Sequence, residues 1–372
     1  MKIGIDISQI VYGTGVSLYT KNLVEHLLKI DRENEYRLFF SSLRGNLPVD
    51  FKIQNKKAKL IKLPIPVSIL EPLWNKWHLF SIERFIGKVD VLHSSDWIQP
   101  PSSAARVTTI HDFGFLKFPD TAHPKIKKVM ERRLFWVKKE IDMVIAVSEA
   151  TKKDSLEILS LPSAKIQVVY EANPENLKKI NDKKKIEKVL KKFKIKTPFV
   201  LSVATIEPRK NLKRLIQAFE SLNDKNLSLV IVGKQGWGDL GPLNFKSSKI
   251  IFTDYVGQEE KAIFYSSALG LAFPSLYEGF GLPVLEAMSC GCPVLTSNVS
   301  SLPEVAGNAG LLVDPLSVKE IAKGLKEITT SKKVKADLIE KGFAQAKKFT
   351  WGKAASQTLE VYKKAYKEKF KK

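Results

Sequence analysis

Short apolar runs alternate with longer amphipathic segments along most of this chain. Residues 2–8 and 143–147 form compact apolar runs typical of buried strands, whereas 16–30 and 125–140 carry apolar residues at helical spacing. The same pattern predicts further strands over 35–41, 59–63, 89–93, 106–111, 166–170, 199–203, 228–232, 250–252, 270–273 and 293–296, and helices over 212–222, 259–267 and 284–289. Alternation of strands and helices is typical of the α/β class with doubly wound parallel sheets.

The alternation stops once, between residues 173 and 196, where lysine replaces most of the apolar residues. We interpret this stretch as a lysine-rich connector that contains a helix. It separates an N-terminal domain, 1–172, from a C-terminal domain, 197–350, and each is long enough to bury its own core.

The net charge of +22 is unevenly distributed. The connector contributes +7 and the terminal segment 351–372 contributes +5, while 1–172 carries +7 and 197–350 only +3. Such clusters indicate solvated helices and linkers, or attraction to an anionic membrane surface, and both interpretations stay open. A basic nucleic-acid-binding module is the weaker alternative, because no nucleic-acid motif accompanies the charge.

The cysteine content and the hydropathy of the chain give information about the cellular compartment of the protein. The chain starts with a strand-like segment, and no apolar run is long enough to span a bilayer. Cys290 and Cys292 are badly placed to bridge each other, and no histidine or further cysteine lies near them in sequence to complete a metal site. We therefore expect a cytoplasmic protein without a metal, in peripheral contact with the inner face of the membrane if the basic segments bind lipid.

The stretch from 273 to 315 carries the most informative chemistry. Glu278 and Glu286 flank a glycine turn, Gly279-Phe280-Gly281-Leu282, that leads from an apolar strand into a helix. Backbone amides of such a turn and the helix N-terminus favour a phosphate, and two carboxylates beside it suggest ligand hydroxyls. The alternative is a glutamate stabilised by the helix dipole without any ligand.

The amino-acid sequence of this stretch resembles that of the retaining glycosyltransferases of family 4, with their E-x7-E element. The residues that carry the resemblance are PSLYEGFGLPVLEAMSCGCPV, followed by SLPEVAG and LLVDP. The resemblance implies the GT-B fold, in which two Rossmann-like domains face a cleft. It also implies that the last helix, from about Trp351, crosses back onto the first domain.

Two more groups of residues support functional roles, each with a structural alternative. His111 follows a predicted strand, where a lone histidine is more often structural. Arg209 and Lys210 lie at a helix start, where two cations oppose the dipole unless an anion binds or water solvates them. The resemblance implies the following roles: donor-sugar contacts from His111, Glu278, Gly279 and Phe280, with His111 and Glu278 catalytic; and nucleotide or phosphate contacts from Arg209, Lys210, Glu286, Gly281, Leu282, Val256, Gly13 and Gly15.

The activity implied is retaining transfer of a hexose, with mannose from GDP-mannose preferred, to a glycan or lipid-linked acceptor. The nucleotide sugar is a substrate, and neither a cofactor nor a metal is expected. A GT-B isomerase or phosphorylase is the alternative enzyme.

Overall fold

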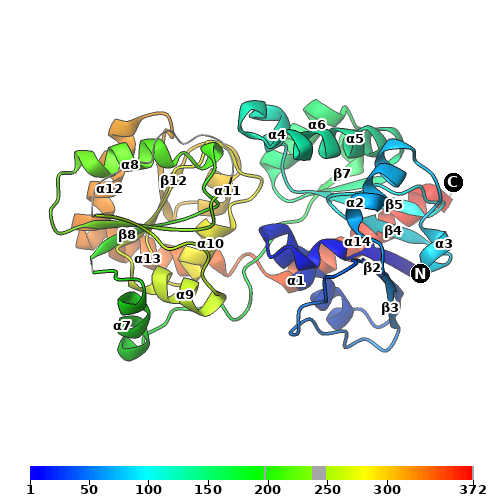
Figure 1. Ribbon diagram of the computed structural model, residues 1–372, viewed down its shortest axis with the longest axis horizontal. Helices are drawn as coiled ribbons and strands as arrows, with labels where there is room; N and C mark the ends of the chain where they lie inside the picture. Colours follow the sequence, from blue (N-terminus) through cyan, green and yellow to red (C-terminus); the bar gives the residue numbers. More distant parts are fainter. Residues whose placement is uncertain (197, 237–248, 371–372) are drawn as a thin grey trace. The chain divides into compact units, whose positions relative to one another are not determined.

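The computed structural model describes residues 1–196, 198–236 and 249–370, and the chain divides into two compact units (Figure 1). The first unit comprises Met1–Phe115, Pro124–Ala172 and the chain from Thr350 onward. The second comprises Leu116–His123 and Asn173–Phe349, so the lysine-rich stretch 173–196 groups with it.

The first unit is built on a seven-stranded sheet in which every paired neighbour is parallel. The strand order is β3-β2-β1-β4-β5-β6-β7. The strands are β1 (Lys2–Asp6), β2 (Glu35–Ser41), β3 (Ala58–Leu63), β4 (Val91–Ser94), β5 (Ala105–Ile110), β6 (Met143–Ala146) and β7 (Ile166–Val168). The winding direction reverses between β1 and β4, which is where open α/β sheets bind ligands.

Helices cover this sheet, and one of them comes from the far end of the chain. The helical segments of the first unit are η1 (Ser8–Val11), α1 (Gly15–Ile30), α2 (Val67–Glu71), η2 (Pro72–Lys76), α3 (Glu83–Ile86), α5 (Pro124–Glu140), α6 (Glu149–Leu159), η4 (Ser163–Lys165) and α14 (Trp351–Phe370). The short segment α4 (Gly114–Lys117) spans the boundary at Phe115, and η3 (Pro119–Thr121) groups with the second unit. α14 packs against α1 and against β5, and its Ala354, Ala355 and Tyr362 are buried there.

The second unit repeats the same winding with six strands. Its order is β10-β9-β8-β11-β12-β13, again parallel throughout. The strands are β8 (Phe199–Val203), β9 (Ser228–Val232), β10 (Ile250–Phe252), β11 (Gly270–Phe273), β12 (Val294–Ser297) and β13 (Gly310–Val313). Here the winding reverses between β8 and β11.

The helices of the second unit pack around this sheet (Figure 1). They are α7 (Lys183–Lys192), η5 (Pro208–Lys210), α8 (Leu212–Ser221), α9 (Gln258–Ser267), α10 (Leu282–Ser289), α11 (Leu302–Ala306), α12 (Val318–Thr330) and α13 (Lys332–Ala346). Apolar residues of α8 and α12 share one core cluster with strands β8 and β9, for example Leu215, Ile321, Val200 and Leu229. Cys290 and Cys292 are buried and unbridged, and burial raises the pKa of Cys290 to about 12.

The α/β class with two doubly wound parallel sheets, predicted from the apolar pattern, is confirmed. The pattern gave no strand at β13 and no helix at α6 or α2. β13 is short and only partly buried, so its apolar signal is weak. Within the part of the chain that the structure describes, none of the helices combines the length and apolarity needed to cross a bilayer.

Candidate functional site

The reversal point of the second sheet brings the basic pair and the first glutamate together. The loop after β8 carries Arg209 and Lys210, and the loop after β11 carries Glu278. Lys210 Nζ donates to Glu278 Oε1 at 2.6 Å, and Arg209 Nη1 donates to Glu278 Oε2 at 3.2 Å. Arg209 Nη1 also donates to the carbonyl of Tyr277 at 2.7 Å. A buried carboxylate and two cations, 68 and 69 residues away in sequence, thus form one cluster.

This cluster controls the charge of Glu278. Burial alone would raise the pKa of its carboxyl, but the charges of Lys210 and Arg209 outweigh burial and lower that pKa. Glu278 therefore stays ionised at neutral pH, and each of its oxygens accepts a hydrogen bond from a different cation.

Two neighbouring residues fix the loop that carries the cations. Glu207 Oε1 accepts from Arg209 Nη2 at 2.8 Å. Asn211 adopts a left-handed backbone with φ +59°, and its Nδ2 donates to the carbonyls of Pro274 and Pro315 at 2.9 and 2.7 Å. These bonds tie the loop after β8 to the loop after β11, so the basic side chains have little freedom.

The glycine turn lies where the sequence placed it, between Glu278 and α10. Gly281 has φ +107° and precedes the helix, and a Cβ there would approach Leu302 to 2.8 Å. Leu282 is the first residue of α10, and no side chain caps this helix start. Ser301 Oγ donates to the carbonyls of Glu278 and Phe280 at 3.0 and 2.7 Å, which pins the turn from the β12–α11 connection.

Gly279 and Phe280 contribute to this turn in different ways. The Phe280 ring is buried edge-on against Phe349, with ring centroids 5.6 Å apart. A ligand at the turn would therefore meet the backbone of Phe280 rather than its ring. Gly279 carries no side chain and lies next to Glu278 in the same loop.

Glu286, one turn into α10, is held by a second helix. Lys261 Nζ donates to Glu286 Oε1 at 2.5 Å and Tyr265 OH donates to Oε2 at 2.8 Å. Lys261 and Tyr265 are four residues apart on α9, hence on one helix face. Burial, followed by the charge of Glu286, raises the pKa of Tyr265 well above its ordinary value.

Val256 lies between β10 and α9 and is buried. The preceding Asp254 has φ +56°, and its carbonyl accepts from the Gly233 amide at 3.0 Å. Gly233 follows β9 and cannot bear a side chain, because a Cβ would lie 1.8 Å from the carbonyl oxygen of Ala204. The connections after β8, β9 and β10 thus approach closely at the same sheet edge.

In the first unit, His111 follows β5 and pairs with a carboxylate. His111 Nδ1 lies 2.9 Å from Glu171 Oε1, and within the described ranges its buried Nε2 has no hydrogen-bond partner. Burial acts to lower the pKa of His111, but the hydrogen bond and charge of Glu171, with Asp96 and Asp112, raise it.

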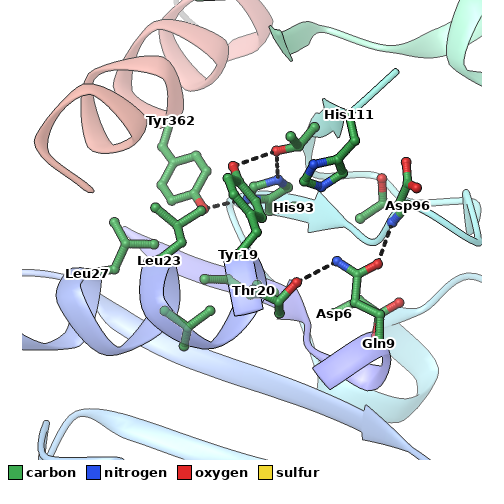
Figure 2. Close-up of a pocket in the computed structure, with 14 residues that line it drawn as sticks. Asp6, Gln9, Tyr19, Thr20, Leu23, Leu27, His93, Asp96, His111 and Tyr362 are labelled. Carbon is green, nitrogen blue, oxygen red and sulfur yellow. Dashed lines mark hydrogen bonds between the residues drawn. The ribbon is translucent and has the colours of Figure 1, made fainter. Parts of the chain in front are cut away.

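A chain of uncharged groups runs beside His111 (Figure 2). Tyr362 OH lies 2.7 Å from His93 Nδ1, and His93 Nε2 lies 3.0 Å from Thr109 Oγ1. Thr109 Oγ1 lies 3.0 Å from Tyr19 OH, and the Tyr19 ring meets His111 edge-on at 4.6 Å. Burial, then the charges of His111 and Arg133, lower the pKa of His93 to about 3, so it is neutral at pH 7.

Gly13 and Gly15 lie in the connection after β1. Gly13 has φ +66° with no atom near the position of a Cβ, so glycine serves the backbone conformation there. Gly15 is the first residue of α1, whose N-terminus is already capped by Thr14 through a reciprocal pair with Ser17.

Sequence reasoning assigned no role to several residues that hold the site. Glu207 lies two residues before Arg209 in the segment Glu207-Pro208-Arg209-Lys210-Asn211, so the local sequence could have indicated it. Lys261 and Tyr265 show only a four-residue spacing, and Glu171 shows no local signal, since it lies 60 residues from His111. Over residues 1–196, 198–236 and 249–370, no three His, Cys, Asp or Glu residues gather as a metal-ligand group.

Comparisons with known proteins identify the family of this chain. Residues 13–172 match the family described as Glycosyltransferase Family 4, and residues 182–345 match Glycosyl transferases group 1. The chain is 30% identical to O-antigen chain mannosyltransferase B of Escherichia coli, over 94% of this chain and 96% of that protein. It is 33% identical to an MMP alpha-(1->4)-mannosyltransferase of Mycolicibacterium hassiacum, over 45% of this chain and 43% of that protein.

Solved structures share the fold. Sucrose-phosphate synthase from Thermosynechococcus elongatus superposes with a TM-score of 0.77 at 20% identity, covering 99% of this chain and 100% of that one. Anabaena HepE in complex with UDP-glucose gives 0.73 at 16% identity, covering 98% and 99%. With its two doubly wound sheets and these matches, the chain belongs to glycosyltransferase family 4 and has the GT-B fold.

Proposed function

We propose that this protein transfers a hexose from a nucleotide diphosphate sugar to a hydroxyl group of a glycan or lipid-linked acceptor, with retention of configuration. The observation that carries the proposal is the cluster of Arg209, Lys210 and Glu278 at the reversal point of the second sheet. Cations at such a point suit a diphosphate, and a carboxylate beside them suits sugar hydroxyls.

The cluster suggests how the donor is received. In this structure Glu278 pairs with both cations, and Glu207 pairs with Arg209 as well. An incoming diphosphate competes for Arg209 and Lys210, which then stabilise the charge that grows on the leaving phosphate. The Glu278 oxygens, released in part from the cations, accept from hydroxyls of the donor sugar. Backbone amides at Gly281 and Leu282 add to the phosphate site.

In the proposed reaction the bond that breaks is matched by the bond that forms, and no covalent intermediate with the enzyme is needed. The bond from the anomeric carbon to the β-phosphate oxygen breaks, and a bond to the acceptor oxygen forms on the same face of the sugar. The acceptor proton passes to an oxygen of the leaving diphosphate. His111 contacts the transferred sugar. Backbone atoms of Gly279 and Phe280 also contact the donor sugar.

The nucleoside has its own partners in this proposal. Glu286 accepts from the ribose hydroxyls, and the backbone around Val256 contacts the base. Because Lys261 and Tyr265 already orient the Glu286 carboxylate, it is prepared for a ligand at small entropic cost.

Mannose from GDP-mannose is the donor we propose, because relatives of this chain carry the name mannosyltransferase, including those of Escherichia coli and Mycolicibacterium hassiacum. We also propose that transfer needs no added metal. Equal initial rates with and without EDTA would agree with this, and a rate restored only by a divalent cation would contradict it.

Thermal unfolding with a panel of nucleotide sugars tests the donor site. A donor at about 100 times its Kd stabilises a protein by about 2.7 kcal/mol. GDP-mannose should give the largest rise in Tm, and a flat response across GDP-, UDP- and ADP-sugars would reject the proposed function. An isomerase or phosphorylase would instead consume the nucleotide sugar, or sugar plus phosphate, without an acceptor.

Peripheral contact with an anionic membrane is a second proposal, favoured by one surface of the first unit. Five large apolar side chains there are about half exposed: Ile69, Trp77, Leu79, Phe80 and Phe135. Basic side chains lie over their rings, with Lys76 above Trp77, Arg84 above Phe80 and Lys139 above Phe135.

One face of α5 is directed inward, since Met130, Leu134 and Val137 are buried. The proposed contact is therefore limited to these exposed rings and cations, each cation contributing about 1 kcal/mol at an anionic surface. Vesicle flotation should show binding to anionic but not neutral lipid, weakened by salt. If the protein does not float with anionic vesicles at low salt, the proposed membrane contact is contradicted.

A further inference from the structure

We infer that Glu171 is a positioning residue for His111, so that the Nε2 atom of this histidine, and not Nδ1, meets the substrate. The inference rests on the proposed function for the identity of that substrate, the donor sugar. The orientation of the ring stands on the structure of the first unit alone.

Two observations on the ring carry the argument. Nδ1 lies 2.9 Å from Glu171 Oε1, whereas Nε2 is buried and makes no hydrogen bond with any residue that the structure describes. A carboxylate accepts only, so the proton on Nδ1 is fixed toward Glu171. The remaining polar atom of the side chain is then the one available to a ligand.

The plane of the ring is fixed from another direction. Tyr19 packs edge-on against His111, with centroids 4.6 Å apart and planes at 88°. Tyr19 is itself held by Thr109, and Thr109 by His93. Figure 2 shows Tyr19, from α1, and His93, from β4, beside His111. Rotation of the imidazole would therefore disturb a connected set of buried groups.

Charged groups face the histidine from several elements. Glu171 follows β7, Asp96 follows β4, and Asp112 follows His111 directly. Arg133 of α5 opposes them, with Nη1 3.4 Å from Asp96 Oδ1, and the neutral His93 lies on β4. Among the carboxylates of the residues that the structure describes, only Glu171 lies within hydrogen-bond distance of the ring, so it alone can select the nitrogen that faces the substrate.

A purely structural ion pair is the competing interpretation, and the chain offers a matched control for it. His78 Nε2 lies 3.1 Å from Glu140 Oε1 in the same unit, with side chains of similar exposure, 13% and 15% against 12% and 7%. Glu140 also pairs with Arg106, at the start of β5 rather than its end. Glu171→Gln and Glu140→Gln thus remove comparable charges from opposite ends of one strand.

The test combines imidazole nitrogen NMR with kinetics on the full chain. His111→Gln assigns the His111 signals among the five histidines. We expect Glu171→Gln to lower the His111 midpoint by about one pH unit or more, and Glu140→Gln to leave it unchanged. Transfer should lose roughly tenfold or more in kcat in Glu171→Gln, with nucleotide affinity retained and the pH profile displaced.

An unchanged His111 midpoint and tautomer in Glu171→Gln would overturn the inference, as would equal loss of kcat in the two variants. If the wild-type protein uses no nucleotide sugar, the proposed function fails. The NMR result then still decides whether Glu171 selects the free nitrogen of His111.

Discussion

At the carboxyl ends of β8 and β11, charged side chains form ion pairs with one another. At the ends of β4 and β5, by contrast, most of the side-chain contacts join uncharged groups. Arg209, Lys210 and Glu278 bind one another directly. In the first unit, Tyr19, Thr109, His93 and Tyr362 form a neutral chain, with the His111–Glu171 and Arg133–Asp96 pairs beside it. One winding pattern therefore supports two kinds of site: exchangeable charges suited to a diphosphate, and a rigid polar frame suited to orienting one ring.

The largest effect is expected from removing the cation pair. Arg209→Ala with Lys210→Ala should lower transfer roughly 100-fold or more, because preorganised donors to a leaving group commonly contribute that much each. Initial rates at saturating donor measure this. Lys332→Ala with Lys333→Ala, two exposed lysines at the start of α13, is the control and should keep wild-type activity. Near-normal transfer in the first variant would reduce the pair to a structural role.

The two glutamates should separate binding from turnover. Glu286→Ala should weaken binding of free GDP by roughly 1.5–3 kcal/mol, as expected for loss of a charged hydrogen-bond partner. Glu278→Ala should reduce turnover while GDP still binds, because Arg209 and Lys210 become available to the diphosphate. Calorimetric titration with GDP compares them, and identical affinity in the wild type and both variants would refute the assignment.

Tyr362→Phe should destabilise the first unit by about 1–3 kcal/mol, since it leaves the buried Nδ1 of His93 without its partner. Tyr366→Phe on the same helix is the control, because that residue is less buried and its ring packs on Phe370. Urea unfolding followed by circular dichroism measures both. A loss equal to that of Tyr366→Phe would show that the neutral chain adds no stability.

The smallest effect expected is the dependence of the unfolding free energy on acid pH through His93. The folded pKa of His93, about 3, lies below its ordinary value of 6.5, so the unfolded chain binds the extra proton first as pH falls. The contribution of His93 is therefore present above pH 6.5 and is lost toward pH 3, by at most about 1.4 kcal/mol per pH unit. The unfolding free energy measured between pH 5 and 7 should depend less on pH in His93→Gln than in the wild type. Parallel pH curves would contradict this.

The same contrast explains what sequence could supply. The apolar pattern predicted the strands of both sheets except β13, because strands buried on both faces are continuous apolar runs, as in Met143–Ala146. The glycine loop around Gly281 and the pair Arg209–Lys210 each consist of residues adjacent in sequence, so their suitability for a phosphate could be inferred from the sequence. The partners of His111, Glu286 and His93 could not be predicted, because Glu171, Lys261 and Tyr362 reach these residues only through tertiary packing.

Transfer from GDP-mannose labelled at the anomeric carbon, followed by NMR with a panel of mannose-ended acceptors, tests the central claim most directly. We predict that GDP is released only with an acceptor present, that the new linkage keeps the anomeric configuration of the donor, and that Arg209→Ala with Lys210→Ala abolishes both signals. An inverted linkage, release of GDP independent of acceptor, or no use of any nucleotide sugar would contradict the account.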